Sequence, residues 1–334
     1  MFSAYTGSRL KENQDFWGEY WAAGPLTSMV DGFESNYRGE LRERWLQFFS
    51  VFPASARLLD IGTGNGAIAM LAAEYSRSEQ RDFELHGADL ALIDPRRSLK
   101  EKAELVDSIT FHSAAAAEDL PFEDRWFDGV SGQYALEYTR HKDALAELWR
   151  VLKPGGRACF VMHDHGSEVL RRGREQLRQI KLIEELKFYD AVDALIGQIG
   201  LMNEGRATAG NEEAEKRRHQ VNEIAASLGA EASSSFSPES LRLAMGFGSR
   251  ALEVLGPKGM ASAREQTARG RKELAGARLR YEDLVRAAGP AGQSQAIVAL
   301  AQKQGFVDLV LEPVKHDSNV LIGQQLTMLR PREG

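Results

Sequence analysis

The feature that most constrains this chain is a glycine-rich turn between an apolar run and a helical segment. Residues 57–61 read RLLDI, which is typical of a buried strand, and a helix is predicted from Ala67 to about Arg77. Between them lies Gly62-Thr63-Gly64-Asn65-Gly66. Glycines let a backbone turn sharply and approach a ligand closely. The start of a helix also offers free N–H groups and a positive dipole end. The stretch therefore predicts a cofactor site above the end of a strand.

The residues around the turn bear on which class of cofactor it would hold. A dinucleotide fingerprint needs glycine, glycine, then glycine or alanine at positions one, three and six, with an acid about 20 residues later. Gly62, Gly64, Ala67 and Asp89 satisfy that pattern loosely. However, Asp60 places a negative charge just before the turn, where it would repel a pyrophosphate and attract an ammonium group. An NAD-dependent oxidoreductase is therefore the less favoured interpretation.

An acid followed by G-x-G-x-G resembles the first motif of the class I S-adenosylmethionine-dependent methyltransferases. The resemblance implies an α/β fold: a doubly wound, seven-stranded, mostly parallel Rossmann-like sheet that ends in an antiparallel hairpin. It implies S-adenosyl-L-methionine as the cofactor and S-adenosyl-L-homocysteine as the product. The cofactor-binding residues that it implies in this motif are Asp60, Gly62, Thr63, Gly64, Asn65 and Gly66.

Two later segments match the same family. Residues 83–90 are expected to form the second strand and end at Asp89, the position of the family's ribose-binding acid, followed by Leu90. A carboxylate there can accept hydrogen bonds from both ribose hydroxyls. Residues 114–122, AAAAEDLPF, resemble the segment that lines adenine, with Ala116 where the family usually has Asp or Asn. We therefore expect the Ala117 N–H and the Glu118 carboxylate to face the adenine.

The acceptor side of the site is expected after the fourth and fifth strands, residues 126–133 and 157–163. The segment RVLKPGG (150–156) is one of the family's more specific signatures and leads into the fifth strand. Ligands of open α/β sheets bind at carboxyl ends of strands. Candidates there are Gln133 for the cofactor, Glu137 for the acceptor, and Tyr134, His163, Asp164 and His165 for catalysis.

Strand alternation would place His163 and His165 on one side and Asp164 on the other. A loop role away from the reacting atoms is the alternative for all three. No further histidine or carboxylate cluster supports a metal site, so none is predicted.

The remaining chain divides into four predicted parts. Residues 1–50 form a helical cap whose Trp17, Tyr20 and Tyr37 are candidate acceptor contacts, and residues 51–166 form the cofactor-binding core. Residues 167–290 form a helical insertion, with helices at 168–201, 212–228, 238–255 and 261–288. Residues 291–334 complete the core, with a helix at 293–304 and strands at 305–311 and 319–329.

The insertion is expected to be a lid over the acceptor. Glycine-rich joints at 205–210 and 229–237 would let it open. A homodimer contact through the insertion is an open alternative. So is use of the insertion as a docking surface for a protein acceptor.

Composition excludes several partner classes. A net charge of −6 over 334 residues argues against a nucleic acid as the principal partner. The single cysteine, Cys159, lies in an apolar run and reads as a packed core thiol. No apolar stretch approaches the ~18–20 residues of a membrane span, and the start lacks a signal-peptide pattern. A soluble, cytoplasmic protein is therefore expected.

Together these patterns predict transfer of a methyl group to an oxygen or nitrogen atom of a small-molecule acceptor. Holding the acceptor and the methyl group close and collinear would supply much of the rate. No Asn/Asp-Pro-Pro-aromatic motif follows the fourth strand, which disfavours amide and adenine acceptors. A protein acceptor and a non-catalytic cofactor-binding subunit remain the alternatives.

Overall fold

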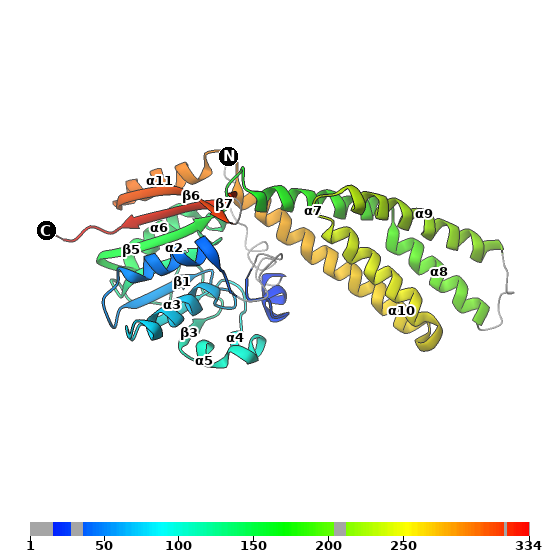
Figure 1. Ribbon diagram of the computed structural model, residues 1–334, viewed down its shortest axis with the longest axis horizontal. Coiled ribbons are helices and arrows are strands. Elements are labelled where there is room, and N and C mark those ends of the chain that lie inside the picture. The colour runs from blue at the N-terminus through cyan, green and yellow to red at the C-terminus, as the bar shows by residue number, and fades with distance from the viewer. Residues whose placement is uncertain (1–15, 28–35, 204–211, 317–318, 334) are drawn as a thin grey trace. The chain divides into compact units, whose positions relative to one another are not determined.

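The computed structural model describes residues 16–27, 36–203, 212–316 and 319–333. The chain forms two compact units, shown with their element labels in Figure 1. The first unit comprises Met1–Leu170 and Arg286–Gly334, and the second comprises Arg171–Val285. Each unit has its own buried core, so each is described by itself.

The first unit contains a seven-stranded sheet in the order β3-β2-β1-β4-β5-β7-β6. Strands β1 to β5 pair in parallel, whereas β7 runs antiparallel to both β5 and β6. The strands are β1 Arg57–Ile61, β2 Glu84–Ala88, β3 Ile109–His112, β4 Phe127–Gln133, β5 Leu152–Met162, β6 Val307–His316 and β7 Val320–Leu329. The predicted seven-stranded, mostly parallel sheet with a C-terminal hairpin is confirmed.

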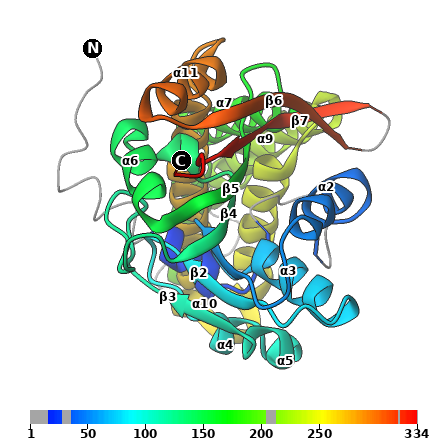
Figure 2. The same cartoon turned by 90° about the vertical axis from the view of Figure 1, so that its left-hand side faces the viewer.

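Helices cover both faces of this sheet (Figure 2). One face carries α2 (Gly39–Ser50) and α3 (Ala67–Ser78), and the other carries α6 (His141–Val151) and α11 (Gln293–Gln304). Short elements complete the unit: α4 Pro95–Ser98, η1 Lys100–Lys102, α5 Ala103–Val106 and η2 Leu136–Tyr138. Residues 16–22 are also helical. The sheet order reverses between β1 and β4, and ligands bind at such a switch point in open α/β sheets.

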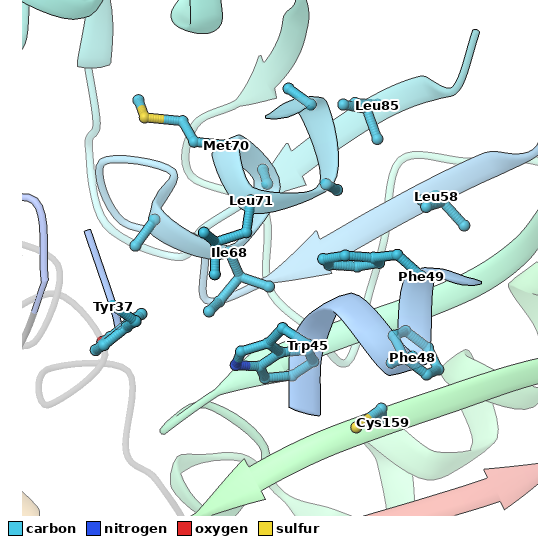
Figure 3. Packing of buried hydrophobic residues seen from close by; sticks show 14 of the residues in the cluster. Tyr37, Trp45, Phe48, Phe49, Leu58, Ile68, Met70, Leu71, Leu85 and Cys159 are labelled. Atoms are coloured by element: carbon cyan, nitrogen blue, oxygen red, sulfur yellow. The ribbon is translucent and has the colours of Figure 1, made fainter. Parts of the chain in front are cut away.

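The alternation of side chains along β5 shows how one strand supplies both cores. Cys159 and Val161 enter the core beneath α2 and α3, whereas Ala158, Phe160 and Met162 enter the core beneath α6 and α11. Figure 3 shows the first of these cores, where side chains of α2, α3, β1 and β5 gather: Trp45, Phe48, Phe49, Leu58, Ile68, Leu71 and Cys159. Burying one such large side chain contributes about 1.5–3 kcal/mol, so these helices are held firmly against the sheet. Cys159 is a buried core thiol, as predicted.

Some strand limits differ from the sequence-based expectation. The fifth strand was predicted at 157–163, but β5 begins at Leu152, which pairs with Phe127 ahead of a register shift, and it ends at Met162. The sixth strand was predicted at 305–311, but β6 extends to His316 because it follows β7 along nearly its whole length. Both differences arise from pairing with a distant strand, which local patterns do not record.

The second unit is helical in its described residues, 171–203 and 212–285. Its helices are α7 Glu168–Glu185, α8 Phe188–Asn203, α9 Glu212–Ser234 and α10 Glu239–Ala288, with α7 and α10 continuing into the first unit. The helical ladder of α10 is interrupted at Gly259, which has φ 78° and ψ 177°. Two separate helices were predicted over 238–255 and 261–288, and Gly259 marks the break between them.

The two predicted joints of the insertion have different outcomes. Residues 205–210 lie outside the described residues. Over 229–237 the prediction of a loose joint is wrong, because α9 continues to Ser234. The residues that follow are held by two buried amides of α7: Gln176 and Gln179 both donate to the Ser237 carbonyl, at 2.8 and 2.6 Å. Gln176 also accepts a bond from the backbone N–H of Ser240 at 2.9 Å.

Candidate active site

The glycine turn has the backbone geometry that its sequence predicts. Gly62, Gly64 and Gly66 have φ values of 63°, 53° and 89°, a region that residues with a Cβ rarely adopt. The Gly66 N–H donates to the Thr63 carbonyl at 2.8 Å, which closes the turn. The Thr63 N–H donates to the Ala88 carbonyl at 3.1 Å and ties the turn to the end of β2.

Protein side chains also pack directly on these glycines. A Cβ added at Gly64 would lie 2.5 Å from the Trp21 ring, and one added at Gly62 would lie 2.5 Å from the Ala135 Cβ. At Gly66 it would lie 2.9 Å from the Phe111 ring. The glycines were predicted to allow a sharp turn of the backbone and close approach to a ligand. The structure adds a further reason for them, which is close packing against protein side chains.

Asp89 lies beside the turn, at the end of β2. Its Oδ2 accepts a hydrogen bond from the Gly64 N–H at 2.7 Å, and its Oδ1 accepts one from the Ala91 N–H at 2.8 Å. Burial raises the pKa of Asp89 to about 6, although both backbone bonds act in the opposite direction. Each carboxylate oxygen has a second lone pair, so the group can still accept bonds from two hydroxyls.

Asp60 lies in β1 directly before the turn and is 4% exposed. The Ser131 hydroxyl donates to its Oδ1 at 2.9 Å. Burial raises the pKa of Asp60 to about 7, and the hydroxyls of Thr63 and Ser131 partly oppose that shift. A cation beside this carboxyl would stabilise its charged form. The site therefore fits a cofactor that brings a positive charge to the turn.

The predicted adenine-lining segment lies alongside Asp89. The Ala115 N–H donates to the Asp89 carbonyl at 2.8 Å, and the Ala114 N–H donates to the Ala91 carbonyl at 3.2 Å. Ala117 is buried, and Leu90 is half-buried. Glu118 was expected to accept from the adenine amino group, but its Oε1 already accepts from the Arg140 N–H at 2.8 Å.

The residues after β4 form a second group, at the strand next to β1. The Gln133 Oε1 accepts from the Trp45 indole N–H at 2.8 Å. The Tyr134 hydroxyl donates to the Ile322 carbonyl at 3.1 Å, and the Tyr134 ring stacks on the His163 ring with centroids 4.0 Å apart. The Glu137 Oε1 accepts from the His163 backbone N–H at 2.6 Å. The structure thus brings together Tyr134, Glu137 and His163, which follow two neighbouring strands, and Gln133 is the last residue of the first of these strands.

Burial sets the protonation states of this second group. It lowers the pKa of His163 to about 3, raises that of Glu137 to about 8, and raises that of Tyr134 well above its usual 10. At neutral pH the imidazole is therefore uncharged and only weakly basic, and the phenol keeps its proton. Once ionised, the Glu137 carboxylate is therefore a stronger base than the imidazole of His163, one of the four catalytic candidates of the sequence.

The prediction that His163 and His165 share one side of a strand is wrong, because β5 ends at Met162. His163 is buried, with its Nε2 3.1 Å from the Tyr138 hydroxyl. His165 is exposed, and its Nδ1 lies 3.0 Å from the Gly289 carbonyl. Asp164 accepts from the Gly166 N–H at 2.8 Å and from the Gln324 amide at 3.1 Å.

The aromatic residues of 16–27 contact both the glycine turn and the residues after β4. The Asn65 amide donates to the carbonyls of Trp21 at 2.8 Å and Pro25 at 2.7 Å, which fastens this segment to the turn. Trp17 stacks on Trp21 and meets the Tyr138 ring edge-on, with centroids 6.4 Å apart. Tyr20 donates to the Thr27 carbonyl at 2.9 Å. Tyr37 is 3% exposed and belongs to the buried cluster that also contains Tyr134.

Trp21 and Tyr138 are the site residues that the sequence-based candidates omitted. Trp21 follows Trp17 at helical spacing, which was the available signal, but only the tertiary structure shows its ring on Gly64. Tyr138 gave no signal beyond its nearness to Glu137.

Residues 59–160 match a protein family described as "Methyltransferase domain". With the strand order and the acid-glycine turn, this match defines a class I S-adenosylmethionine-dependent methyltransferase core. The ubiquinone/menaquinone biosynthesis C-methyltransferase of Bartonella henselae is 35% identical over 116 residues, covering 34% of this chain and 42% of that protein. The corresponding protein of Brucella suis biovar 1 is 37% identical over 102 residues, covering 30% and 36%. The chain thus spans less than half the length of these curated relatives.

Among solved structures, the PH0226 protein of Pyrococcus horikoshii OT3 is similar at 25% identity and a TM-score of 0.38. That similarity covers 47% of this chain and 66% of the other. A score this low adds nothing to the fold assignment, which rests on the strand order. Within the residues that the structure describes, no helix is both long and apolar enough to traverse a bilayer.

Proposed function

We propose that this protein is an S-adenosylmethionine-dependent methyltransferase that methylates an oxygen or nitrogen atom of a small-molecule acceptor. The observation that carries the proposal is the pair of buried carboxyls, Asp60 and Asp89, on either side of a turn whose three glycines all have positive φ. Their raised pKa values indicate charged forms that need partners in this site. A nucleoside that carries an amino acid brings both partners, an ammonium group and two ribose hydroxyls.

Each part of the core then has a role toward the cofactor. The Asp60 carboxylate attracts the positive charge of the cofactor, and Asp89 accepts hydrogen bonds from the ribose hydroxyls. The Ala117 N–H faces the adenine. The bound cofactor supplies a methyl group on a sulfonium, with a neutral thioether as leaving group. The chain's own task is to hold the acceptor in line with that methyl group and to exclude water. Trp17 and Trp21 would limit the access of water from the side of residues 16–27.

The acceptor is proposed to be small because the groups near the methyl position are buried. Gln133, Glu137 and His163 are 8%, 4% and 5% exposed, which leaves little room for a protein side chain with its backbone. Transfer to carbon is a second candidate, because the two curated relatives are named as C-methyltransferases. Their similarity covers only 34% and 30% of this chain, however, so it does not define the acceptor.

Titration calorimetry with S-adenosyl-L-homocysteine tests the cofactor class. We expect saturable binding to the parent protein and a loss of about tenfold or more in Asp89→Asn, since a neutral amide accepts hydrogen bonds more weakly than a carboxylate. Asp107→Asn, an exposed acid far along the chain from the turn, is the matched control. Binding of NAD without binding of S-adenosyl-L-homocysteine would refute the proposal.

A further inference from the structure

The segment that follows β4 touches the glycine turn directly. The Cβ of Ala135 lies 2.5 Å from the position that a Cβ on Gly62 would take, so these two backbones are in contact. Glu137 lies two residues further on, in η2, at the carboxyl end of the strand next to β1. It therefore lies at the sheet edge where the proposed cofactor would present its reactive group.

Glu137 is only half satisfied by the protein. Its Oε1 accepts from the His163 N–H, whereas its Oε2 is buried and has no hydrogen-bond partner among the residues the structure describes. Within that same part of the chain, the Gln133 Nε2 and the His163 Nδ1 are also buried without partners. Buried polar atoms in proteins are nearly always paired, so the unpaired atoms of Glu137 and His163, two residues joined by a hydrogen bond, need an explanation.

The surroundings of Glu137 favour a hydrogen-bond donor over an anion. In the described ranges no Lys or Arg forms an ion pair with Glu137, and burial is the main cause of its raised pKa. The neighbouring rings are neutral: His163 stacks on Tyr134, and Tyr138 lies 3.1 Å from the His163 Nε2. A carboxylate or phosphate here would meet a carboxyl group with no compensating positive charge.

Building on the proposed function, we propose that the Glu137 Oε2 accepts a hydrogen bond from the acceptor's reacting N–H or O–H group and takes its proton during transfer. The acceptor is then an amine or a hydroxyl compound such as a phenol or enol, and not a carboxylate or phosphate. The Gln133 Nε2 donates to a second polar atom of the acceptor. His163 positions Glu137 through its backbone N–H.

The proposed step balances in atoms and charge. The acceptor nitrogen or oxygen forms a bond to the methyl carbon while the carbon–sulfur bond breaks and its electron pair stays on sulfur. The acceptor proton moves to the Glu137 Oε2. A sulfonium and a carboxylate are thereby replaced by a thioether and a carboxylic acid, and the acceptor remains neutral.

Sinefungin tests this assignment without knowledge of the acceptor. It resembles S-adenosyl-L-homocysteine but carries an amine where the cofactor carries its methylated sulfur. If Glu137 faces that position, its carboxylate should pair with the ammonium group of sinefungin. At about pH 8.5, where the carboxylate form is populated, we expect the parent protein to bind sinefungin about tenfold more tightly than S-adenosyl-L-homocysteine.

Calorimetry on three variants separates the outcomes. Glu137→Gln keeps the size of the side chain, so we expect unchanged affinity for S-adenosyl-L-homocysteine and loss of the preference for sinefungin. If that variant does not fold, Glu137→Asp, which withdraws the carboxylate by one methylene, should also lose the preference. Glu123→Gln, at an exposed acid, should keep it.

The possible failures are distinct. A sinefungin preference that persists in Glu137→Gln, or that is absent in the parent protein, overturns the role of Glu137 while the proposed function stands. Failure of the parent protein to bind S-adenosyl-L-homocysteine overturns the proposed function, and this inference with it.

Discussion

The backbone N–H of Gly64 donates a hydrogen bond to the Asp89 Oδ2 at 2.7 Å, so the glycine turn and the acid at the end of β2 form one unit. The turn is a local feature of the sequence, and the acid lies 25 positions later. Their contact gives Asp89 a structural role beside the proposed ribose-binding role. Experiments on Asp89 must therefore separate the two.

The first prediction concerns that separation. Asp89→Ala removes the acceptors of the Gly64 and Ala91 N–H groups, so we expect a loss of about 2–4 kcal/mol in the free energy of unfolding. Strand-end acids seldom stabilise a core, but this one does so through the turn. Asp89→Asn keeps one acceptor oxygen but turns an NH2 donor toward the other N–H, so it should lose less than Asp89→Ala, by about 1–2 kcal/mol. Urea unfolding of both variants without ligand measures the difference, and equal losses would show that the two bonds contribute little.

A second prediction concerns the packing of Trp21 on Gly64. Gly64→Ala places a Cβ 2.5 Å from the indole at a backbone φ of 53°, so it should destabilise the protein even without cofactor, by about 2–4 kcal/mol. In a double-mutant cycle with Trp21→Ala, the contact part of this cost should be relieved by about 1 kcal/mol or more. Strict additivity of the two substitutions would mean that only the backbone strain matters.

A third prediction concerns the attachment of residues 16–27 to the turn. Asn65→Ala removes the donor to the Trp21 and Pro25 carbonyls, so amide hydrogen exchange across 16–27 should become about tenfold faster or more. Exchange in β1 and β4 should be unchanged. Asn36→Ala, which removes a side-chain bond to the Ala67 carbonyl, serves as the control and should leave exchange in 16–27 unchanged.

The fourth prediction is a pH dependence of stability. Burial raises the pKa of Asp60 to about 7 and that of Glu137 to about 8, so the folded state binds protons more tightly than the unfolded state does. Stability from these groups is therefore fully present below about pH 4 and is lost as the pH rises through about 7 and 8. Other titrating groups also change the stability with pH, so the pH dependence of the parent protein must be compared with that of variants lacking each carboxyl.

We expect the parent protein without ligand to be less stable at about pH 8.5 than at about pH 6. Asp60→Asn and Glu137→Gln should each reduce this difference, by on the order of 1–3 kcal/mol. Urea unfolding at the two pH values measures it. If the difference in unfolding free energy between the two pH values is the same in the parent and both variants, neither carboxyl titrates in this range.

A fifth prediction concerns the independence of the first unit. Replacing 171–285 by a short glycine-serine linker joins Leu170 to Arg286, the limits of the second unit. Because the sheet has its own two cores, the shortened protein should unfold cooperatively and bind S-adenosyl-L-homocysteine within about tenfold of the parent. Loss of binding in a folded variant would show that the insertion contributes to the cofactor site.

Local patterns in the sequence determined the elements of the first unit. The predicted limits of β1 and α11 agree with the structure, and those of α3 differ by one residue. Hydrophobic periodicity and glycine conformation act over a few residues, so they can be read from the chain directly. The positions of Asp60 and Asp89 at the glycine turn followed from the same reasoning together with the family resemblance.

Tertiary structure decided the chemistry of the acceptor side. His163 and His165 are two positions apart, yet one is buried against Tyr134 and the other is exposed, because β5 ends before both. Burial raises the pKa of Glu137, whose carboxylate contacts the backbone N–H of His163, 26 positions later. Burial, like the packing of Trp21 on Gly64, depends on which distant segments meet, and no local pattern contains that information.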